Sequence, residues 1–176
     1  MYTEIEAKIK VDELESYRQK LIALRAEFAG QARQCDTYFD DANKSIKKSD
    51  SGFRLRCQTI NDKTTAILCF KGPRQLGPFK NRSETEVLID SADNMIKILN
   101  QLGYQQKRTV AKTRDTYQLN DALICLDNVD QLGCFIEIEA PSEKSVHDNL
   151  LLLGLDPKNH ISKGYARLLA DKVKED

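Results

Sequence analysis

Histidine, long apolar runs and net charge are scarce or missing in this sequence of 176 residues. Only two histidines, His147 and His160, are present, both near the C-terminus, so a Ser-His or Cys-His nucleophilic site is not expected. No apolar run approaches the ~18 residues of a membrane span, and the N-terminus carries charge within four residues. We therefore expect a cytoplasmic protein with no membrane partner.

Net charge is absent because 27 basic residues match 27 acidic ones. No overall field would draw such a protein onto nucleic acid, so nucleic acid is not an expected partner. Any site for an anion must then come from a local arrangement of side chains.

The five cysteines are odd in number, widely spaced and free of any Cys-x-x-Cys pair, and no histidine lies near enough in sequence to complete a zinc set. Reduced and mostly buried thiols are the expected state of Cys35, Cys57, Cys69, Cys125 and Cys134.

The length fits one domain, 1–176, because two independent domains would each be short of apolar surface. The composition is globular, with 40% hydrophobic and 31% charged residues and no low-complexity tract.

Hydrophobic periodicity predicts four helices. The first begins at Asp12 and continues through Phe28 to Gly30, and the second begins at Ser91 and ends at Gly103. Two shorter helices are predicted near 142–153 and 161–172.

A period of two predicts eight strands. They lie at about 2–11, 34–40, 52–60, 65–71, 82–89, 108–118, 122–127 and 134–140. Two long loops, 40–52 and 72–81, separate some of them, and the second has the composition of a lid.

Charged residues occupy one face of almost every predicted strand. Glu4, Glu6, Lys8 and Lys10 alternate with Ile5, Ala7, Ile9 and Val11. The same alternation places together Arg54 with Arg56, Arg82 with Glu84 and Glu86, Lys112 with Arg114, and Glu137 with Glu139, while Asp127 ends its strand.

For a single strand, an ordinary sheet with its charged face in water explains this pattern. The repetition over several strands favours a closed sheet with the charges inside. Unpaired charge in such an interior is costly, so bound ions must complete it. Carboxylates supply oxygen ligands for Mg²⁺ or Mn²⁺, and clustered Arg and Lys bind phosphate oxygens.

Several short motifs resemble the CYTH superfamily, the triphosphate tunnel metalloenzymes. They are Glu4-Ile5-Glu6-Ala7-Lys8, Phe53-Arg54-Leu55-Arg56, Phe70-Lys71-Gly72-Pro73, Arg82-Ser83-Glu84-Thr85-Glu86, Lys112-Thr113-Arg114, Leu126-Asp127-Asn128-Val129 and the segment from Leu132 to Glu139. Within the superfamily, Leu132-Gly133 and the ending Lys163-Gly164-Tyr165-Ala166-Arg167-Leu168-Leu169 look most like the class IV adenylyl cyclase branch, although Lys163 and Gly164 stand where that branch has Arg and Ser.

The resemblance implies an α+β protein with an eight-stranded antiparallel β-barrel and helices packed outside. It places Glu4, Glu6, Asp127, Glu137 and Glu139 on Mg²⁺ or Mn²⁺. It places Lys8, Arg54, Arg56, Lys71, Arg82, Lys112 and Arg114 on the triphosphate, with Glu84 and Glu86 less defined. Catalysis is assigned to Glu6, Lys8, Asp127 and Glu137.

The activity that this resemblance implies is conversion of ATP to cyclic AMP and pyrophosphate. A triphosphatase acting on tripolyphosphate, thiamine triphosphate or nucleoside triphosphates would use the same residues. A polyphosphate- or nucleotide-binding module without turnover and a plain structural barrel are further alternatives. The partner is a small triphosphate such as ATP, and a homodimer is compatible with the sequence.

Overall fold

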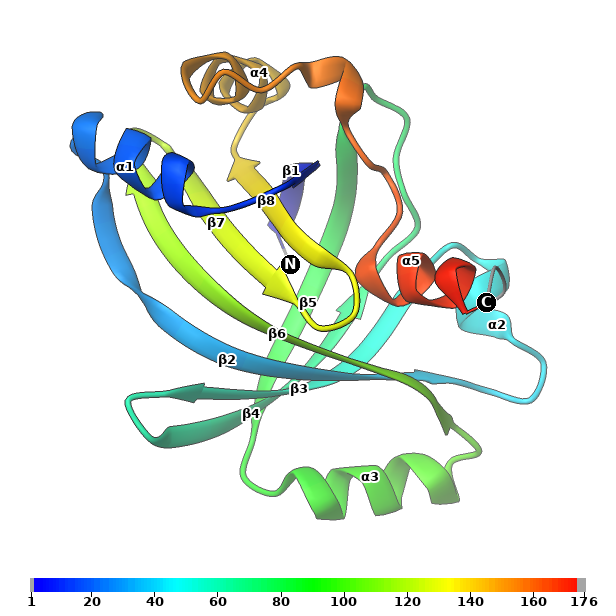
Figure 1. The fold of residues 1–176 in the computed structure, drawn as a ribbon. Helices are drawn as coiled ribbons and strands as arrows, with labels where there is room; N and C mark the ends of the chain where they lie inside the picture. The colour runs from blue at the N-terminus through cyan, green and yellow to red at the C-terminus, as the bar shows by residue number, and fades with distance from the viewer. Residues whose placement is uncertain (1, 174–176) are drawn as a thin grey trace.

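Eight antiparallel strands form a closed barrel in this computed structural model, which describes residues 2–173, with side chains from residue 5 (Figure 1). The strand order around the barrel is β1-β5-β4-β3-β2-β6-β7-β8. The strands are β1 (Tyr2–Val11), β2 (Glu27–Asp40), β3 (Gly52–Ile60), β4 (Lys63–Lys71), β5 (Lys80–Ile89), β6 (Gln105–Leu119), β7 (Ala122–Val129) and β8 (Gly133–Ala140). The predicted barrel of eight strands is confirmed.

The helices lie outside the barrel, as predicted (Figure 1). They are α1 (Glu15–Ala23), α2 (Ser45–Lys48), α3 (Ala92–Gln101), α4 (Glu143–Leu152) and α5 (Tyr165–Lys172), with a 3₁₀ turn at Pro157–Asn159. Ser91 and Ser142 cap α3 and α4 through their side-chain oxygens, which accept hydrogen bonds from backbone N–H groups three residues on. Within the described residues, none of these helices is long and apolar enough to cross a membrane.

The first predicted helix is wrong at both ends. Helix α1 begins at Glu15 and ends at Ala23, and Phe28 belongs to strand β2. Phe28 pairs with Tyr117 of β6, with ring centroids 5.1 Å apart. The helical spacing of Phe28 was therefore coincidental, because a cross-strand contact that local periodicity cannot reveal fixes it in the sheet.

The last helix begins at Tyr165 rather than at Ile161, because the segment before it pairs with β1. Strand β5 pairs with β1 only as far as Glu6. Beyond that point the Lys8 N–H donates to His160 Nδ1 at 3.1 Å, and the Ile161 N–H donates to the Lys8 carbonyl at 2.8 Å. Residues 160–161 thus continue the hydrogen bonding along β1 where β5 diverges.

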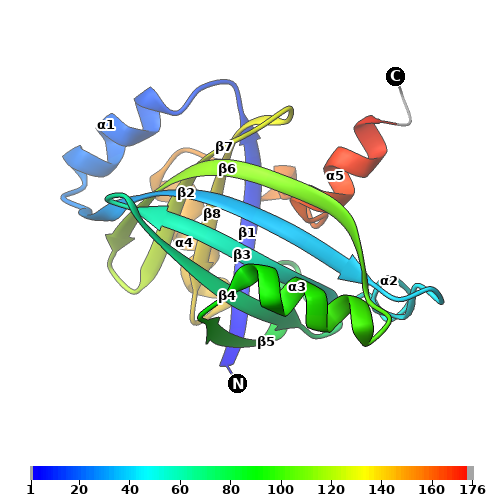
Figure 2. The same cartoon turned by 90° about the horizontal axis from the view of Figure 1, so that it is seen from below.

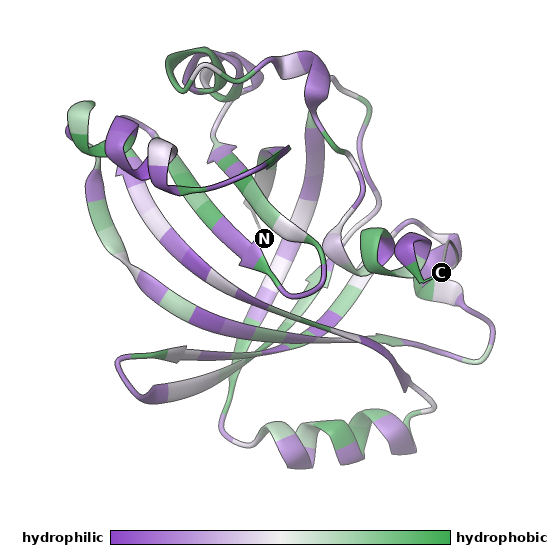
Figure 3. Ribbon diagram, viewed as in Figure 1, coloured by the Kyte–Doolittle hydropathy of each residue, from purple (hydrophilic) through white to green (hydrophobic). Residues whose placement is uncertain are grey.

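The hydrophobic core lies between the barrel wall and the helices, not inside the barrel. Ile124 and Ile138 on the outer face pack with Leu21 of α1 and Leu150 of α4, all fully buried. On the opposite side Leu99 of α3 packs against the outer faces of β3 and β4 (Figure 2). Hydrophilic and hydrophobic residues alternate along most strands (Figure 3), so the strands turn their polar faces inward.

Candidate active site

The barrel encloses a cavity of about 840 Å³ that is lined by fifteen basic and seven acidic side chains. The whole chain carries no net charge, so positive charge has been concentrated in the interior. A cavity of this size and sign fits a small polyanion. All seven residues predicted to bind triphosphate line it: Lys8, Arg54, Arg56, Lys71, Arg82, Lys112 and Arg114.

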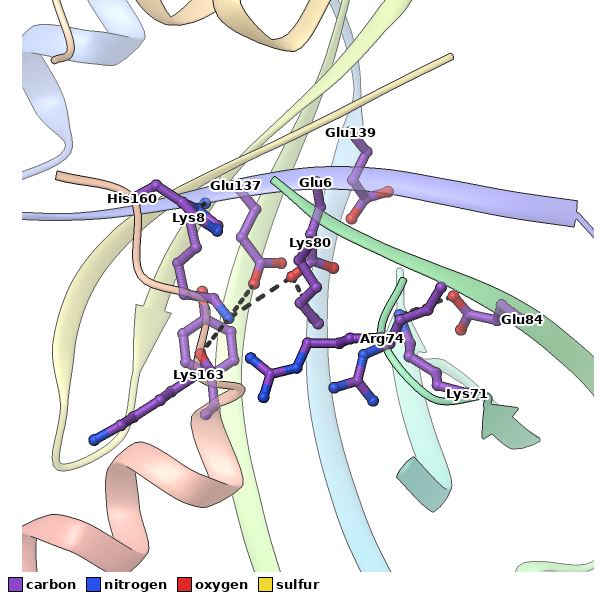
Figure 4. A network of polar contacts seen from close by, with 12 residues as sticks. Glu6, Lys8, Lys71, Arg74, Lys80, Glu84, Glu137, Glu139, His160 and Lys163 are labelled. Carbon is purple, nitrogen blue, oxygen red and sulfur yellow. Dashed lines mark hydrogen bonds and ion pairs between the residues drawn. The ribbon is translucent and has the colours of Figure 1, made fainter. Parts of the chain in front are cut away.

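The predicted carboxylates also converge on this cavity, which Glu6, Glu137 and Glu139 line directly (Figure 4). Asp127 lies immediately behind the lining with no exposed surface. The Glu4 side chain lies outside the described residues. The structure therefore brings together every described residue that the sequence predicted for the site.

Antiparallel register explains why acids and bases meet. Lys8 of β1 lies directly opposite Glu137 of β8, and Arg114 of β6 lies directly opposite Asp127 of β7. Directly opposite side chains on one face are within reach of each other. Lys8 Nζ accordingly approaches Glu137 Oε1 at 3.0 Å, although the Lys8 residue is only 1% exposed.

Asp127 is the shared counter-ion of two predicted triphosphate ligands. Its carboxylate accepts hydrogen bonds from Lys112 Nζ at 2.7 Å and from Arg114 Nε and Nη2, both at 2.6 Å. A fourth donor, the Tyr165 hydroxyl of α5, lies at 2.8 Å. Because both oxygens are engaged, the geometry favours a role in holding the two cations, and the metal-binding role of Asp127 stays a prediction.

Asp36 of β2 does the same for the arginines of β3, and sequence reasoning missed it. Its carboxylate accepts from Arg56 Nε at 2.7 Å, from Arg56 Nη2 at 2.8 Å and from Arg54 Nη1 at 3.2 Å. Burial would raise the pKa of Asp36, but the two guanidinium groups outweigh it and hold the pKa well below its usual range. The alternation of Asp36, Tyr38 and Asp40 with Cys35, Thr37 and Phe39 was the available signal.

Lys80 and Tyr165 are further cavity-lining residues without a role in the sequence prediction, and Glu84, whose role that prediction left undefined, also lines the cavity. Lys80 pairs with Glu6, and Lys71 Nζ pairs with Glu84 at 2.8 Å. The Tyr165 ring lies beneath the ammonium groups of Lys8 and Lys112, 4.1 and 4.9 Å from its centroid. The sequence analysis missed Lys80 because it assigned residues 72–81 to a loop, whereas β5 begins at Lys80.

Glu84 also forms an acidic group with Cys69 and Glu86, whose possible ligand atoms lie within 4.8 Å of one another. The Cys69 thiol donates to Glu84 Oε1 at 2.9 Å, and Arg54 Nη2 lies 3.7 Å from the same oxygen. With Lys71 and Arg54 beside it, Glu84 is already balanced by positive charge. This group is therefore less suited to a cation than the carboxylates of β1 and β8.

The carboxylates of β1 and β8 stay the predicted ligands of a divalent cation. Glu6 and Glu139 lie directly opposite each other, a placement that is unfavourable for two like charges unless a cation joins them. Burial alone would raise the pKa of Glu6, but the positive charge of Lys80 lowers it to about 2. Glu139 has Arg114 Nη1 only at 3.6 Å, and burial together with Glu137 and Glu6 raises its pKa despite that guanidinium.

The comparisons with known proteins agree with this geometry. A Methanocaldococcus jannaschii protein whose name proposes an adenylate cyclase activity is 29% identical over 94% of this chain and 97% of its own. The solved PH1819 protein of Pyrococcus horikoshii OT3 is 28% identical and superposes with a TM-score of 0.83 over 96% of this chain and 99% of that one.

A Hippeastrum protein, named as a candidate adenylyl cyclase and described as having a dominant triphosphatase activity, shares the fold. It has a TM-score of 0.67 and 15% identity over 99% of this chain and 96% of that one. The family model of the CYTH domain matches residues 2–165. The chain therefore belongs to the CYTH family.

Proposed function

We propose that this protein is a metal-dependent enzyme that binds an organic triphosphate in its barrel, and that it converts ATP to cyclic AMP and pyrophosphate. One observation carries the proposal: a neutral chain concentrates fifteen basic side chains around a cavity of about 840 Å³. Even with Asp36 and Asp127 behind the lining, basic groups outnumber acidic ones there. A polyanionic substrate restores the balance.

The basic residues bind and orient the phosphates. Asp127 holds Lys112 and Arg114 in place, and Asp36 holds Arg54 and Arg56, so these four cations are positioned before substrate arrives. Groups that are fixed in advance stabilise developing charge without a reorganisation cost. Each retains N–H donors beyond those its carboxylate accepts, because an ammonium has three and a guanidinium five.

The carboxylates Glu6, Glu137 and Glu139 would hold the Mg²⁺ or Mn²⁺ ion. When bound, such an ion lowers the pKa of the ribose 3′-hydroxyl and neutralises charge on the phosphates. Lys8, which pairs with Glu137 at the cavity wall, stays protonated because the neighbouring Glu137 and Glu6 raise its pKa against the effect of burial. It therefore binds phosphate as a cation and does not act as a base.

Two features support attack at the α-phosphorus. The Methanocaldococcus jannaschii relative is similar to this chain along nearly its whole length. The C-terminal segment that resembles the cyclase branch also reaches the cavity, where Tyr165 contacts Asp127.

A triphosphatase is the second candidate, and one observation favours it. Lys163, which stands where the cyclase branch has arginine, pairs its ammonium with Asp171, 2.8 Å away, and Gly164 supplies no hydroxyl. Two contacts of the cyclase branch are therefore not available here in the same form. The same inward residues would serve water attack at the γ-phosphorus.

Phosphorus NMR of the reaction with ATP and Mg²⁺ or Mn²⁺ separates the two. Cyclisation releases pyrophosphate without orthophosphate, which is the result we expect. Orthophosphate and ADP as the sole early products would replace the cyclase by the triphosphatase. Binding of ATP without any product, with thiamine triphosphate and tripolyphosphate also unchanged, would instead indicate a binding module.

A further inference from the structure

Two arginines converge on one carboxylate at the mouth of the cavity. Arg74 Nε donates to Asp50 Oδ2 at 2.6 Å. Arg82 of β5 donates through Nη1 to the Asp50 carbonyl at 2.8 Å and approaches Asp50 Oδ1 with Nη2 at 3.5 Å. All three residues line the cavity, although Asp50 precedes β3 and Arg74 follows β4.

The segment that carries Arg74 is anchored at its base. The Gly72 N–H donates to the Ser83 carbonyl at 2.9 Å, and the Gln75 N–H donates to the Asn81 carbonyl at 2.8 Å. A Cβ at Gly72 would come within 2.4 Å of Ser83 Oγ, so glycine permits this close approach. Figure 4 shows the Arg74 side chain projecting toward the charged group that includes Lys71 and Lys80.

The charges at this mouth are not balanced. One carboxylate serves two guanidinium groups, and Arg82 Nε is buried without a hydrogen-bond partner among the described residues. Burial lowers the pKa of Arg82 and the neighbouring Arg74 adds to it, while Asp50 compensates only in part. The arrangement has room for further negative charge.

The Asp50 carboxylate is also easy to displace. Its side chain is 49% exposed and that of Arg74 is 40% exposed, and ion pairs between exposed groups contribute little to stability. A phosphate carries more charge than a carboxylate and matches the donor geometry of guanidinium at least as well. A phosphate oxygen of the substrate can therefore take the place of Asp50.

We propose that Arg74 is a further substrate-binding residue, and that Asp50 is an internal competitor that occupies Arg74 and Arg82 until a substrate phosphate displaces it. The proposal rests on the proposed function, because it assumes a phosphate-bearing substrate in the cavity. It adds a residue outside the barrel strands to the binding site and gives the 72–79 segment a role in affinity.

Breaking the same ion pair from its two sides tests this. Asp50→Asn keeps a residue that tolerates the left-handed backbone at this position, where φ is 53°, and removes the competing charge. Arg74→Ala removes the phosphate ligand. Leu76→Ser, at a fully exposed position of the same segment, is the matched control.

Calorimetric titration of each purified protein with tripolyphosphate and Mg²⁺ gives the readout. We expect Arg74→Ala to weaken binding about tenfold, as loss of a hydrogen bond between charged groups does. Asp50→Asn should tighten binding roughly threefold, the scale of an exposed ion pair. The control should match wild type.

If the Asp50–Arg74 ion pair were purely structural, both variants would change the affinity for tripolyphosphate in the same direction or leave it unchanged. Either result overturns the proposal. Weaker binding by Arg74→Ala with unchanged binding by Asp50→Asn would keep Arg74 as a ligand and overturn the competitor role. If wild type binds tripolyphosphate and the variants bind equally well, only this inference fails. If wild type does not bind, the proposed function fails with it.

Discussion

The β6–β7 side of the barrel and the β1–β8 side carry similar charged residues but balance them differently. Around Asp127, Lys112, Arg114 and Tyr165 supply donors to both carboxylate oxygens. Around Glu139, the guanidinium of Arg114 approaches only to 3.6 Å, and burial together with two other carboxylates raises the pKa of Glu139. A carboxylate whose two oxygens both accept hydrogen bonds, such as Asp127, holds its neighbours in place. A carboxylate with little positive charge beside it, such as Glu139, would be stabilised most by a bound cation.

Asp127→Asn should produce the largest effect on stability. It removes the carboxylate that both Lys112 and Arg114 contact, leaving Arg114 only its contacts with Glu137 and Glu139, and loss of a buried counter-ion costs about 3–5 kcal/mol. Urea denaturation measures the free energy of unfolding. Asp130→Asn is the control, since the Asp130–Arg33 pair is about half exposed and should contribute less than about 1 kcal/mol. Equal losses in the two variants would contradict the distinction between the two sides.

Glu139→Gln should affect activity rather than stability. Without metal it should leave the melting temperature unchanged or higher, because it removes one of three neighbouring carboxylates. With Mg²⁺ it should lower activity by up to about a hundredfold, since a contact that supports a metal is lost. A variant that melts lower in EDTA and keeps wild-type activity would show that Glu139 is structural.

The strands and their charged faces were predictable because they depend on a local pattern, the alternation of residues along strands such as 2–11 and 134–140, and the barrel followed from the resemblance of its motifs to the CYTH superfamily. Pairing between distant residues was not predictable. The 3.6-residue spacing of Phe28 could not show that Tyr117 lies opposite it, and the sequence around Lys80 could not show that β5 begins there opposite Glu6. Asp36 carries the same alternation, but its role depends on register with Arg56.

Tyr165→Phe, on the β6–β7 side of the barrel, should lower the free energy of unfolding less than Asp127→Asn does. It removes one donor to Asp127 while keeping the ring beneath Lys8 and Lys112. A hydrogen bond to a charged group is worth about 1.5 kcal/mol at the low end, which is appropriate because other donors remain. Denaturant unfolding should show this loss, and Tyr17→Phe on α1, outside the cavity, should not. A loss as large as that of Asp127→Asn would mean that the hydroxyl alone orders the site.

The contact between His160 and β1 should give the smallest effect, a dependence of the free energy of unfolding on pH. Burial lowers the pKa of His160 below 6.5, and the nearby Lys8 and Lys80 add to this and outweigh the opposing charge of Glu6. As pH falls through 6.5 the unfolded chain binds the proton first, so stability present above pH 6.5 is lost below it. The loss should stay under about 1 kcal/mol because the ring is partly exposed.

Melting of wild type and His160→Asn between pH 7 and pH 5 measures this effect, with the asparagine oxygen able to accept the Lys8 N–H. The variant should lose less stability than wild type as the solution is acidified. Parallel curves would show that His160 does not contribute to the pH dependence.

Thermal melting of the wild-type protein with increasing tripolyphosphate and Mg²⁺ tests the central claim, that the barrel interior binds a triphosphate together with metal. We predict a melting temperature that rises with the logarithm of ligand concentration, that rises less when Mg²⁺ is replaced by EDTA, and that rises less at high salt. An unchanged melting temperature at millimolar tripolyphosphate with Mg²⁺ would contradict the account.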